Sequence, residues 1–425
     1  MALVKDMSQQ DLQERANQLR NRYEEYKAMG LQLNMARGKP GPEQMDLTMG
    51  LLDCVNERTG ALSEDGEDTR NYGMLEGIPE ARKLFGEVLE MDPSNVIVGG
   101  NSSLNLMFDY ISMAYTKGVG GCEPWSRQGA VKFLCPSPGY DRHFAVTEYF
   151  GVELLTVPMT QQGPDMDEVE RLAADPLVKG IWCVPMYSNP TGITYSDETV
   201  RRLAAMKTGA PDFRIMWDNA YGLHHLSEDH DRLLNLYEEA VKCGTGDRVI
   251  CFCSTSKISF SGAGVAAMAA SPANIAEIKN RMGYQTIGYD KINMLRHVRY
   301  FHDRKGLEEH MKLHAAILRP KFRVVLDTLQ NRLGGRGIAS WIEPKGGYFV
   351  SVDLPEGCAK QTVSMLKEAG VTLTGAGATY PYGKDPRDSN LRIAPTYPSV
   401  DELQTAMDLF CLCAELVYIE KLLKE

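Results

Sequence analysis

Between about residues 95 and 270, short apolar runs alternate with stretches whose apolar residues recur at helical spacing. This alternation is typical of βα units that feed a parallel sheet. In one helical stretch, Leu104, Met107, Phe108, Ile111 and Ala114 would share a face. The expected strands are Val96–Val98, Val131–Leu134, Val152–Leu155, Ile181–Val184, Phe213–Met216 and Val249–Phe252. The pattern predicts an α/β protein with a mostly parallel sheet.

The pattern changes after this region. Residues 274–333 are charged, with Leu and Met interleaved, and they predict one long connecting helix. Strand patterns follow at Gly346–Val352 and Leu391–Ile393, before a closing helix rich in Leu and Met. We expect a large domain over residues 50–305 and a smaller α+β domain built from residues 1–49 and 306–425.

Composition narrows the class of protein. A chain of 425 residues with 43% hydrophobic content can bury two cores. The net charge of -10 and the absence of a Lys/Arg run argue against nucleic acid as a partner. The polar amino terminus and the lack of an 18-residue apolar run predict a cytoplasmic protein that does not bind membranes. The ten cysteines show no metal-binding spacing, so we expect reduced thiols and no metal site.

The most informative residue is Lys257, which follows an expected strand in the segment Ser254-Thr255-Ser256-Lys257. A lysine amine that can lose its proton captures an aldehyde as a Schiff base. Asp218 ends the preceding strand, where a buried carboxylate could keep a pyridine nitrogen protonated, although alone it could equally be a turn or cap residue. Tyr221 follows Asp218 by three positions, and Asn189 comes after the previous expected strand. Both could hydrogen-bond the ring oxygen of a cofactor that contains such a pyridine.

Two further segments could complete such a site. The segment Gly99-Gly100-Asn101-Ser102-Ser103 lies between an expected strand and a helix, where backbone amides and hydroxyls can hold a phosphate or simply cap the helix. Tyr140 follows the next strand and could stack on a pyridine ring or belong to the core. With Lys257 and Asp218, these residues indicate a site for pyridoxal 5'-phosphate.

Eight short motifs occur in one order along nearly the whole chain. They are Tyr72-x4-Gly77-x4-Arg82, Asn101-Ser102, Tyr140, Asn189-Pro190-x-Gly192, Asp218-x2-Tyr221, Ser254-x2-Lys257, Gly346-Gly347 and Arg392. This order resembles the fold-type I, class I/II aminotransferases. The segments Asn34–Pro40 and Ser256–Val265 most resemble the subgroup Ic aspartate aminotransferases, which are related to the effector domains of MocR-type regulators.

The resemblance implies a fold, a cofactor and a role for each residue. The fold would have a seven-stranded-type sheet, and pyridoxal 5'-phosphate would be the cofactor. Lys257 would form the Schiff base and move the substrate proton, while Arg392 would bind the substrate α-carboxylate and Gly38 and Asn189 would lie beside it. Tyr72 would reach the cofactor phosphate of the neighbouring subunit of a homodimer. The cofactor-binding residues would be Tyr72, Gly100, Asn101, Ser102, Ser103, Tyr140, Asn189, Asp218, Tyr221, Ser254 and Lys257.

The chain departs from the family pattern eight positions after the lysine. Most relatives carry a phosphate-binding Arg there, and this chain carries Val265. Hydroxyls of the surrounding serines, Ser261 included, would compensate in part, and Arg281 is a candidate replacement. A substrate with a second carboxylate needs another cation, for which the candidates are Arg37, Lys39 and Arg142.

The expected reaction is transfer of an amino group between an L-amino acid, aspartate or glutamate, and a 2-oxo acid such as 2-oxoglutarate or oxaloacetate. An aromatic or other amino donor is the alternative within this class. A lyase or decarboxylase on the same fold would use the same lysine and aspartate. A non-enzymatic MocR-like effector-binding protein would carry a basic DNA-binding domain in front, whereas only 33 residues, not basic in character, precede Asn34.

Overall fold

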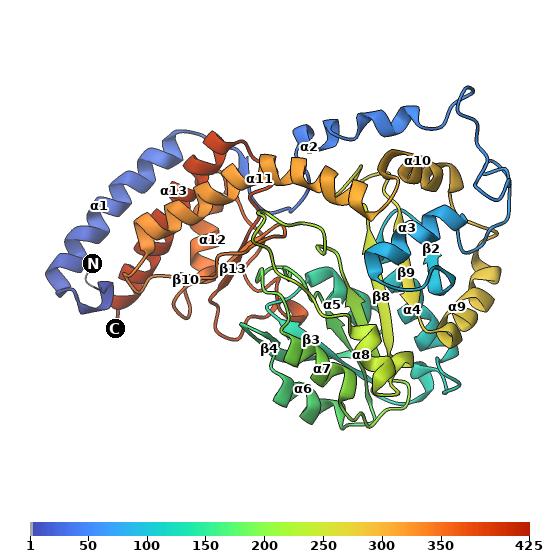
Figure 1. Cartoon of the computed structure of the whole chain (residues 1–425). Coiled ribbons are helices and arrows are strands. Elements are labelled where there is room, and N and C mark those ends of the chain that lie inside the picture. The colour runs from blue at the N-terminus through green and yellow to red at the C-terminus, as the bar shows by residue number, and fades with distance from the viewer. Residues whose placement is uncertain (1–2) are drawn as a thin grey trace.

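The computed structural model describes residues 3–425 and contains a central sheet covered by helices on both faces (Figure 1). The strands of this sheet are β2 (Val96–Val98), β3 (Lys132–Ser137), β4 (Glu153–Thr160), β5 (Gly163–Pro164), β6 (Val178–Cys183), β7 (Arg214–Asp218), β8 (Val249–Ser254) and β9 (Ala266–Ala270). Their order across the sheet is β2-β9-β8-β7-β6-β3-β4-β5. The expected α/β class is confirmed.

Strands β8, β7, β6, β3 and β4 run parallel, so their carboxyl ends meet at one edge of the sheet. Every residue of β6 and β7 is buried, because helices cover both faces. These helices are α3 (Pro79–Leu89), α4 (Ser103–Lys117), α5 (Asp141–Tyr149), α6 (Met166–Ala173), α7 (Asp197–Ala205), α8 (Leu236–Lys242), α9 (Pro272–Gln285) and α10 (Lys291–Phe301).

A second body lies beside the sheet and joins distant parts of the sequence. It contains α1 (Gln9–Ala28), α12 (Ala359–Glu368), α13 (Val400–Leu422), the parallel pair β1 (Leu33–Asn34) and β12 (Val371–Thr372), and the antiparallel strands β10 (Ser340–Trp341), β11 (Val350–Asp353) and β13 (Asn390–Ile393). In Figure 1, α1 lies along α13, and Arg15 on α1 pairs with Glu415 on α13 at 2.7 Å.

Helix α11 (Arg304–Leu333) contributes to two apolar clusters. Leu307 and Met311 pack with Leu51, whereas Leu318 and Leu333 pack in the core of the second body. Because α11 belongs to both apolar cores, it does not mark a boundary between two domains. The expected domain limits at residues 49/50 and 305/306 therefore stay a prediction.

Short elements complete the described chain. They are α2 (Pro42–Asp46) and the 3₁₀ turns η1 (Val4–Asp6), η2 (Met49–Asp53), η3 (Pro93–Asn95), η4 (Trp125–Arg127), η5 (Gly246–Arg248) and η6 (Pro381–Gly383). Within residues 3–425, no helix is long and apolar enough to cross a membrane. The same residues contain no cluster of three His, Cys, Asp or Glu side chains suited to a metal ion.

Two sequence-based expectations about elements were wrong, and strand β9 was missed. Residues 274–333 form α9, α10 and α11 instead of one helix, because Asp290 and Asp303 cap new helices. Strand β9 was not anticipated, since its sequence Ala-Ala-Met-Ala-Ala lacks the β-branched and aromatic residues that favour strands. On α4, Phe108 is 37% exposed, and the buried face is formed by Leu106, Met107, Tyr110, Ile111, Met113 and Ala114.

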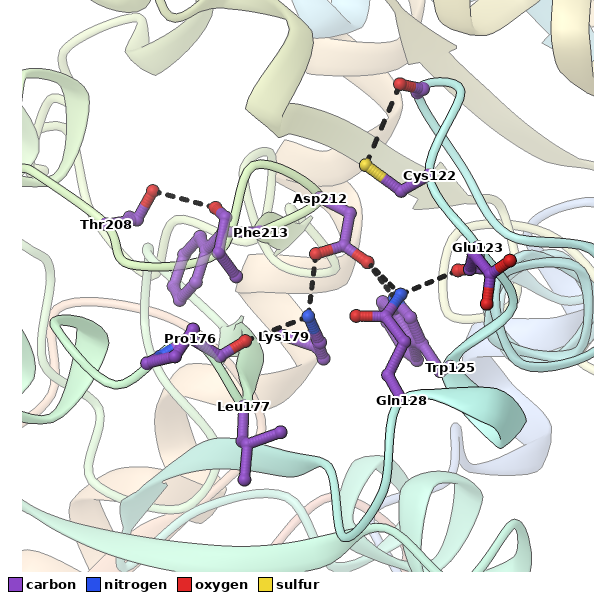
Figure 2. Close-up of polar contacts among 12 residues, drawn as sticks. Cys122, Glu123, Trp125, Gln128, Pro176, Leu177, Lys179, Thr208, Asp212 and Phe213 are labelled. Atoms are coloured by element: carbon purple, nitrogen blue, oxygen red, sulfur yellow. Dashed lines mark hydrogen bonds and ion pairs between the residues drawn. The ribbon is translucent and has the colours of Figure 1, made fainter.

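A buried polar cluster lies at the amino ends of β6 and β7, at the opposite edge from the carboxyl ends (Figure 2). Lys179 Nζ lies 2.9 Å from Asp212 Oδ1, and both side chains are almost fully buried. The second oxygen of Asp212 accepts hydrogen bonds from Trp125 Nε1 at 3.0 Å and Gln128 Nε2 at 2.9 Å. These bonds satisfy a charge pair that would otherwise be costly to bury.

Candidate active site

A cavity of about 210 Å³ opens at the carboxyl ends of the parallel strands. Eight of the residues expected at a cofactor site line it: Ser102, Ser103, Tyr140, Asn189, Asp218, Tyr221, Ser254 and Lys257. Ser256, Ser261, Val184, Ala220, Leu104 and Met107 complete the walls. Residues far apart in the sequence therefore converge because parallel strands end at one edge.

Asp218 is held from behind by a histidine that the sequence analysis did not single out. His143 Nε2 lies 2.9 Å from Asp218 Oδ2, and both side chains are buried. The His143 ring stacks on Trp182, with ring centres 4.5 Å apart, and meets Tyr140 edge-on. The other carboxylate oxygen, Asp218 Oδ1, is buried and has no hydrogen-bond partner among residues 3–425.

Lys257 lies in a turn that is fixed through Thr255. The Thr255 carbonyl accepts from the amides of Ile258 and Ser259, and Thr255 Oγ1 accepts from the amide of Val265 at 2.9 Å. His297 Nδ1 lies 2.7 Å from the Asn293 carbonyl, so this nitrogen donates and Nε2 accepts from Ser259 Oγ at 2.8 Å.

Aromatic rings surround the amine of Lys257. Its Nζ lies 5.0 Å from the centre of the Tyr221 ring and 5.9 Å from that of Tyr348. Burial raises the pKa of Tyr221, against which a hydrogen bond with Asn189 lowers it. Burial likewise raises the pKa of Tyr140 to about 12, while the nearby charge of Lys257 lowers it. Both phenols therefore carry their protons at neutral pH.

Arg392 does not line the cavity, but its guanidinium is held beside it. Nη1 donates to Asn189 Oδ1 at 3.1 Å and to Asp141 Oδ1 at 3.0 Å, and Nη2 donates to Thr374 Oγ1 at 3.3 Å. The guanidinium carbon lies 4.9 Å from the centre of the Phe349 ring. Its Nε is buried and has no partner in the part of the chain that the structure describes, so this N–H can donate to a ligand.

Gly38 is required by its close approach to Phe349. A Cβ atom at residue 38 would lie 2.4 Å from Phe349 Cζ, closer than any side chain allows. Because the same ring packs against Arg392, the segment around Gly38 and the guanidinium contact one aromatic side chain.

Tyr348, which precedes Phe349 in the chain, belongs to a buried hydrogen-bond network that reaches the backbone of Lys257. Gln44 Nε2 lies 3.0 Å from Tyr348 OH and 2.9 Å from His314 Nδ1, while Gln44 Oε1 accepts from the amide of Gly41. The Tyr348 hydroxyl lies 3.4 Å from the Lys257 carbonyl oxygen. Because Gln44 Oε1 accepts from Gly41, the Nε2 group of Gln44 must be the donor to His314 Nδ1. The proton of the His314 ring is then on its Nε2.

The phosphate-binding end expected from the sequence consists of serines. Ser102 caps α4 by accepting from the Leu104 amide at 3.2 Å, while Ser254 Oγ donates to Ser256 Oγ and Ser261 Oγ donates to the Ser256 carbonyl. Val265 is 2% exposed and belongs to the core between the sheet and its helices. Residue 265 therefore offers no cation to a phosphate.

Several expected residues lie outside the cavity wall. Gly100 takes a left-handed φ of +70°, and the Asn101 carbonyl accepts from Ser256 Oγ at 3.3 Å, so both support the wall from behind. Tyr72 is 82% exposed on the protomer surface. Arg281 is not a replacement for the missing arginine within the protomer, because it lies on α9, hydrogen-bonds Ser112 and lines a different cavity.

The three candidate cations for a second carboxylate also lie outside the cavity wall. Lys39 Nζ is 3.9 Å from the centre of the Tyr397 ring. Arg37 is exposed between Ala36, whose carbonyl accepts from Thr374, and Gly38, which packs on Phe349. Arg142 is exposed on α5, next in the chain to the buried His143.

Sequence reasoning missed His143, Asp141, Gln44, His310 and His314. The spacing offered one signal, because His143 follows Tyr140 by three positions at a helix start and such residues share a helical face. Gln44 and His314 are 270 positions apart, and nothing in the local pattern connects them.

Comparisons with known proteins agree with this geometry. The family model described as aspartate amino-transferase matches residues 7–425. An aspartate aminotransferase of Corynebacterium glutamicum is 44% identical over 95% of this chain and 93% of its own length. A solved aspartate transaminase from Corynebacterium glutamicum superimposes with a TM-score of 0.96 at 42% identity and covers 99% of both chains. An α-aminoadipate aminotransferase of Thermus thermophilus, 21% identical over 92% of this chain and 93% of its own, shares the fold with a TM-score of 0.74. The chain therefore belongs to the aspartate aminotransferase family and is a fold-type I aminotransferase.

Proposed function

We propose that this chain uses pyridoxal 5'-phosphate to move an amino group between aspartate or glutamate and a 2-oxo acid, as a cytoplasmic homodimer. The observation that carries the proposal is the buried, unpartnered Oδ1 of Asp218 in the cavity that also contains Lys257. A protonated pyridine nitrogen would satisfy that oxygen, while His143 holds the other. The residues present therefore fit the cofactor.

The proposed role of each residue follows from the chemical group that it brings to the cavity. Bound pyridoxal phosphate supplies an aldehyde for amines and a ring that accepts electrons. Lys257 Nζ takes the proton from the substrate Cα and returns it, because it is the amine that lines the cavity. Asn189 and the protonated Tyr221 hydroxyl bind the ring oxygen. Asp218 keeps the proton on the ring nitrogen.

The cofactor phosphate would be bound mainly by neutral groups. Ser102, Ser103 and Ser254 offer hydroxyls, and the amino end of α4 adds its backbone amides and dipole. Tyr72, exposed on its own protomer, would bind the phosphate of the partner subunit. The absence of an arginine at residue 265 predicts weaker cofactor binding than a guanidinium would provide.

Substrate choice would depend on two arginines. Arg392 binds the α-carboxylate, and its free Nε adds a donor to the two terminal nitrogens. We propose Arg37 for the second carboxylate, since both of its chain neighbours contact residues that touch Arg392. Lys39 is engaged by Tyr397.

The decisive experiment is a spectroscopic assay of the purified protein. Visible absorbance of the bound cofactor should be present, should be lost on adding aspartate or glutamate, and should return with 2-oxoglutarate or oxaloacetate. Lys257→Ala should still bind the cofactor without turnover, and Asp218→Asn should be slower by several orders of magnitude. Release of carbon dioxide or ammonia without amino transfer would instead indicate a decarboxylase or lyase, and an unaltered rate in Lys257→Ala would refute the proposal.

The homodimer can be tested by mixing two inactive subunits. A hybrid of Lys257→Ala and Tyr72→Ala subunits would contain one complete site, made from Lys257 of one subunit and Tyr72 of the other. Activity should rise on mixing toward about a quarter of the wild-type value, as random pairing predicts. Tyr149→Ala, at another exposed tyrosine, is the matched control. If mixing the two variants does not raise the transamination activity, Tyr72 does not contribute to the site of the neighbouring subunit.

A further inference from the structure

A second cavity, of about 300 Å³, lies directly behind the active-site cavity. Ala220 and Ser254 line both cavities, so they form a common wall. The rear cavity is enclosed by the loop of residues 222–235, by α3 and by the start of α11. Its volume reaches the lower end of the range that binds small molecules.

Two residues that line this rear cavity, His224 and Asn219, have buried polar atoms without a partner among residues 3–425. His224 is 4% exposed, and within the described part of the chain neither of its ring nitrogens forms a hydrogen bond, nor does the buried Oδ1 of Asn219. Burial, followed by the charge of Lys257, lowers the pKa of His224 well below its ordinary value. The neutral ring therefore offers one donor and one acceptor, and leaving them unpaired is costly.

The remaining inner wall is apolar. Phe85, Leu223, Leu236 and Leu307 are buried and line the cavity together with the indole of Trp217. Apolar walls of this kind favour a hydrocarbon or aromatic body, and the few polar atoms would fix its orientation.

The mouth carries one free cation. Glu90, His230 and Arg232 are the exposed lining residues. Glu90 pairs with Arg304 at 2.8 Å, and the His230 ring stacks on His225 with centres 3.9 Å apart. Arg232 forms no hydrogen bond or ion pair with any residue in 3–425, so its guanidinium is available to an anion.

We propose that the rear cavity binds a small aromatic carboxylic acid that carries a hydroxyl or N–H group on its ring. The ring occupies the apolar interior, its polar group pairs with His224 and Asn219, and its carboxylate binds Arg232 at the mouth. Because Ala220 and Ser254 separate this ligand from the active-site cavity, its binding changes turnover without blocking the substrate. Binding itself does not depend on the proposed reaction, and only its effect on turnover does.

The probe is 4-hydroxyphenylacetate, titrated into the cofactor-loaded protein by calorimetry. Phenylacetate lacks the hydroxyl and tyramine replaces the carboxylate by an ammonium group, so both should bind more weakly, by about tenfold or more. Equal binding of tyramine would overturn the assignment of an acidic ligand. If none of the probes produces a heat of binding at millimolar concentration, the proposal is overturned, and the cavity would contain only water.

Variants locate the bound probe. Arg232→Gln should weaken binding about tenfold, and Leu234→Trp, which fills the cavity from its loop, should abolish it. Arg323→Gln, at an exposed arginine on α11 that forms no ion pair with the described residues, is the matched control and should bind normally. Arg392→Ala should retain the probe, and loss of binding only in that variant would place the probe in the substrate site and overturn the proposal.

Kinetics separate the two cavities. The probe should change kcat while leaving the KM for the amino donor unaltered, and the Leu234→Trp variant should not respond. Competition with the amino donor would contradict a rear site. If the protein binds the probe but shows no transamination at all, the proposed function fails and the binding site stands.

Discussion

His143 Nε2 lies 2.9 Å from Oδ2 of Asp218, a residue of the cavity wall, and the other oxygen of this carboxylate is buried and has no partner within residues 3–425. The imidazole is itself fixed by the Trp182 ring against which it stacks. A histidine outside the cavity wall therefore orients the carboxylate that would hold the cofactor.

Removing this support should slow the reaction while leaving the cofactor bound. His143→Leu deletes one hydrogen bond to a charged group, and a loss of about 10- to 100-fold in kcat is expected. His143→Gln keeps a donor and should recover part of the rate. Stopped-flow measurement of cofactor absorbance after adding amino acid would check this, and a rate unchanged in His143→Leu would mean that Asp218 needs no such orientation.

Arg392→Lys should weaken substrate binding by about 2–5 kcal/mol, because lysine keeps the charge and loses the paired donors. Amines without the α-carboxylate should be poor substrates for the wild type and almost unaffected by the change. Single-turnover bleaching with matched amines, carboxylated and decarboxylated, makes the comparison. An equal loss for both kinds of amine would assign Arg392 a structural role.

Gln44→Leu should weaken the hydrogen-bond network that reaches the backbone of Lys257 through Tyr348. The variant loses the donors to His314 and Tyr348, which should lower the free energy of unfolding by about 1–3 kcal/mol. Capture of added pyridoxal phosphate by the apoprotein, followed by visible absorbance, should also slow. Gln18→Leu on exposed α1 is the control, and normal capture in Gln44→Leu would confine the network to stability.

Stability should fall in acid because of buried neutral histidines. Burial lowers the pKa of His297 and of His314 to about 4, from 6.5 in an unfolded chain. Between these values the unfolded chain binds more protons at these two residues, so their contribution to stability is constant above about pH 6.5 and falls as the pH drops toward 4. Urea midpoints across this range should show a shallower fall in His297→Gln than in the control His302→Asn, whose histidine is exposed. Identical slopes would exclude His297 as a contributor.

Lys179→Met should destabilise the fold without altering the active site. The change leaves the buried carboxylate of Asp212 without its cation and should cost about 3–5 kcal/mol of unfolding free energy. Arg201→Gln, which breaks an exposed pair with Asp197, should cost less than about 1 kcal/mol. Denaturant titration measures both. A substantial change in kcat of the folded Lys179→Met protein would show coupling between the two edges of the sheet.

Chain order and apolar runs were enough to anticipate the residues that end parallel strands. Asn189 and Asp218 could be identified because the apolar runs Ile181–Val184 and Ile215–Trp217 come before them and parallel strands share an edge. The same reasoning failed for β9, because alanines become a strand only through their neighbours β2 and β8. His143 and Gln44 act through contacts between elements, which no local periodicity records.

Helix α11 carries one more consequence, through the proline inside it. Pro320 has no amide hydrogen, so the carbonyl of Ala316 lacks its helical donor. On one side of this point His310 and His314 lie beneath the Lys257 turn, and on the other Leu329 and Leu333 are buried in the second body. The backbone of α11 therefore has one helical hydrogen bond fewer just after the part that supports the Lys257 turn, so a bend of this helix would cost least there.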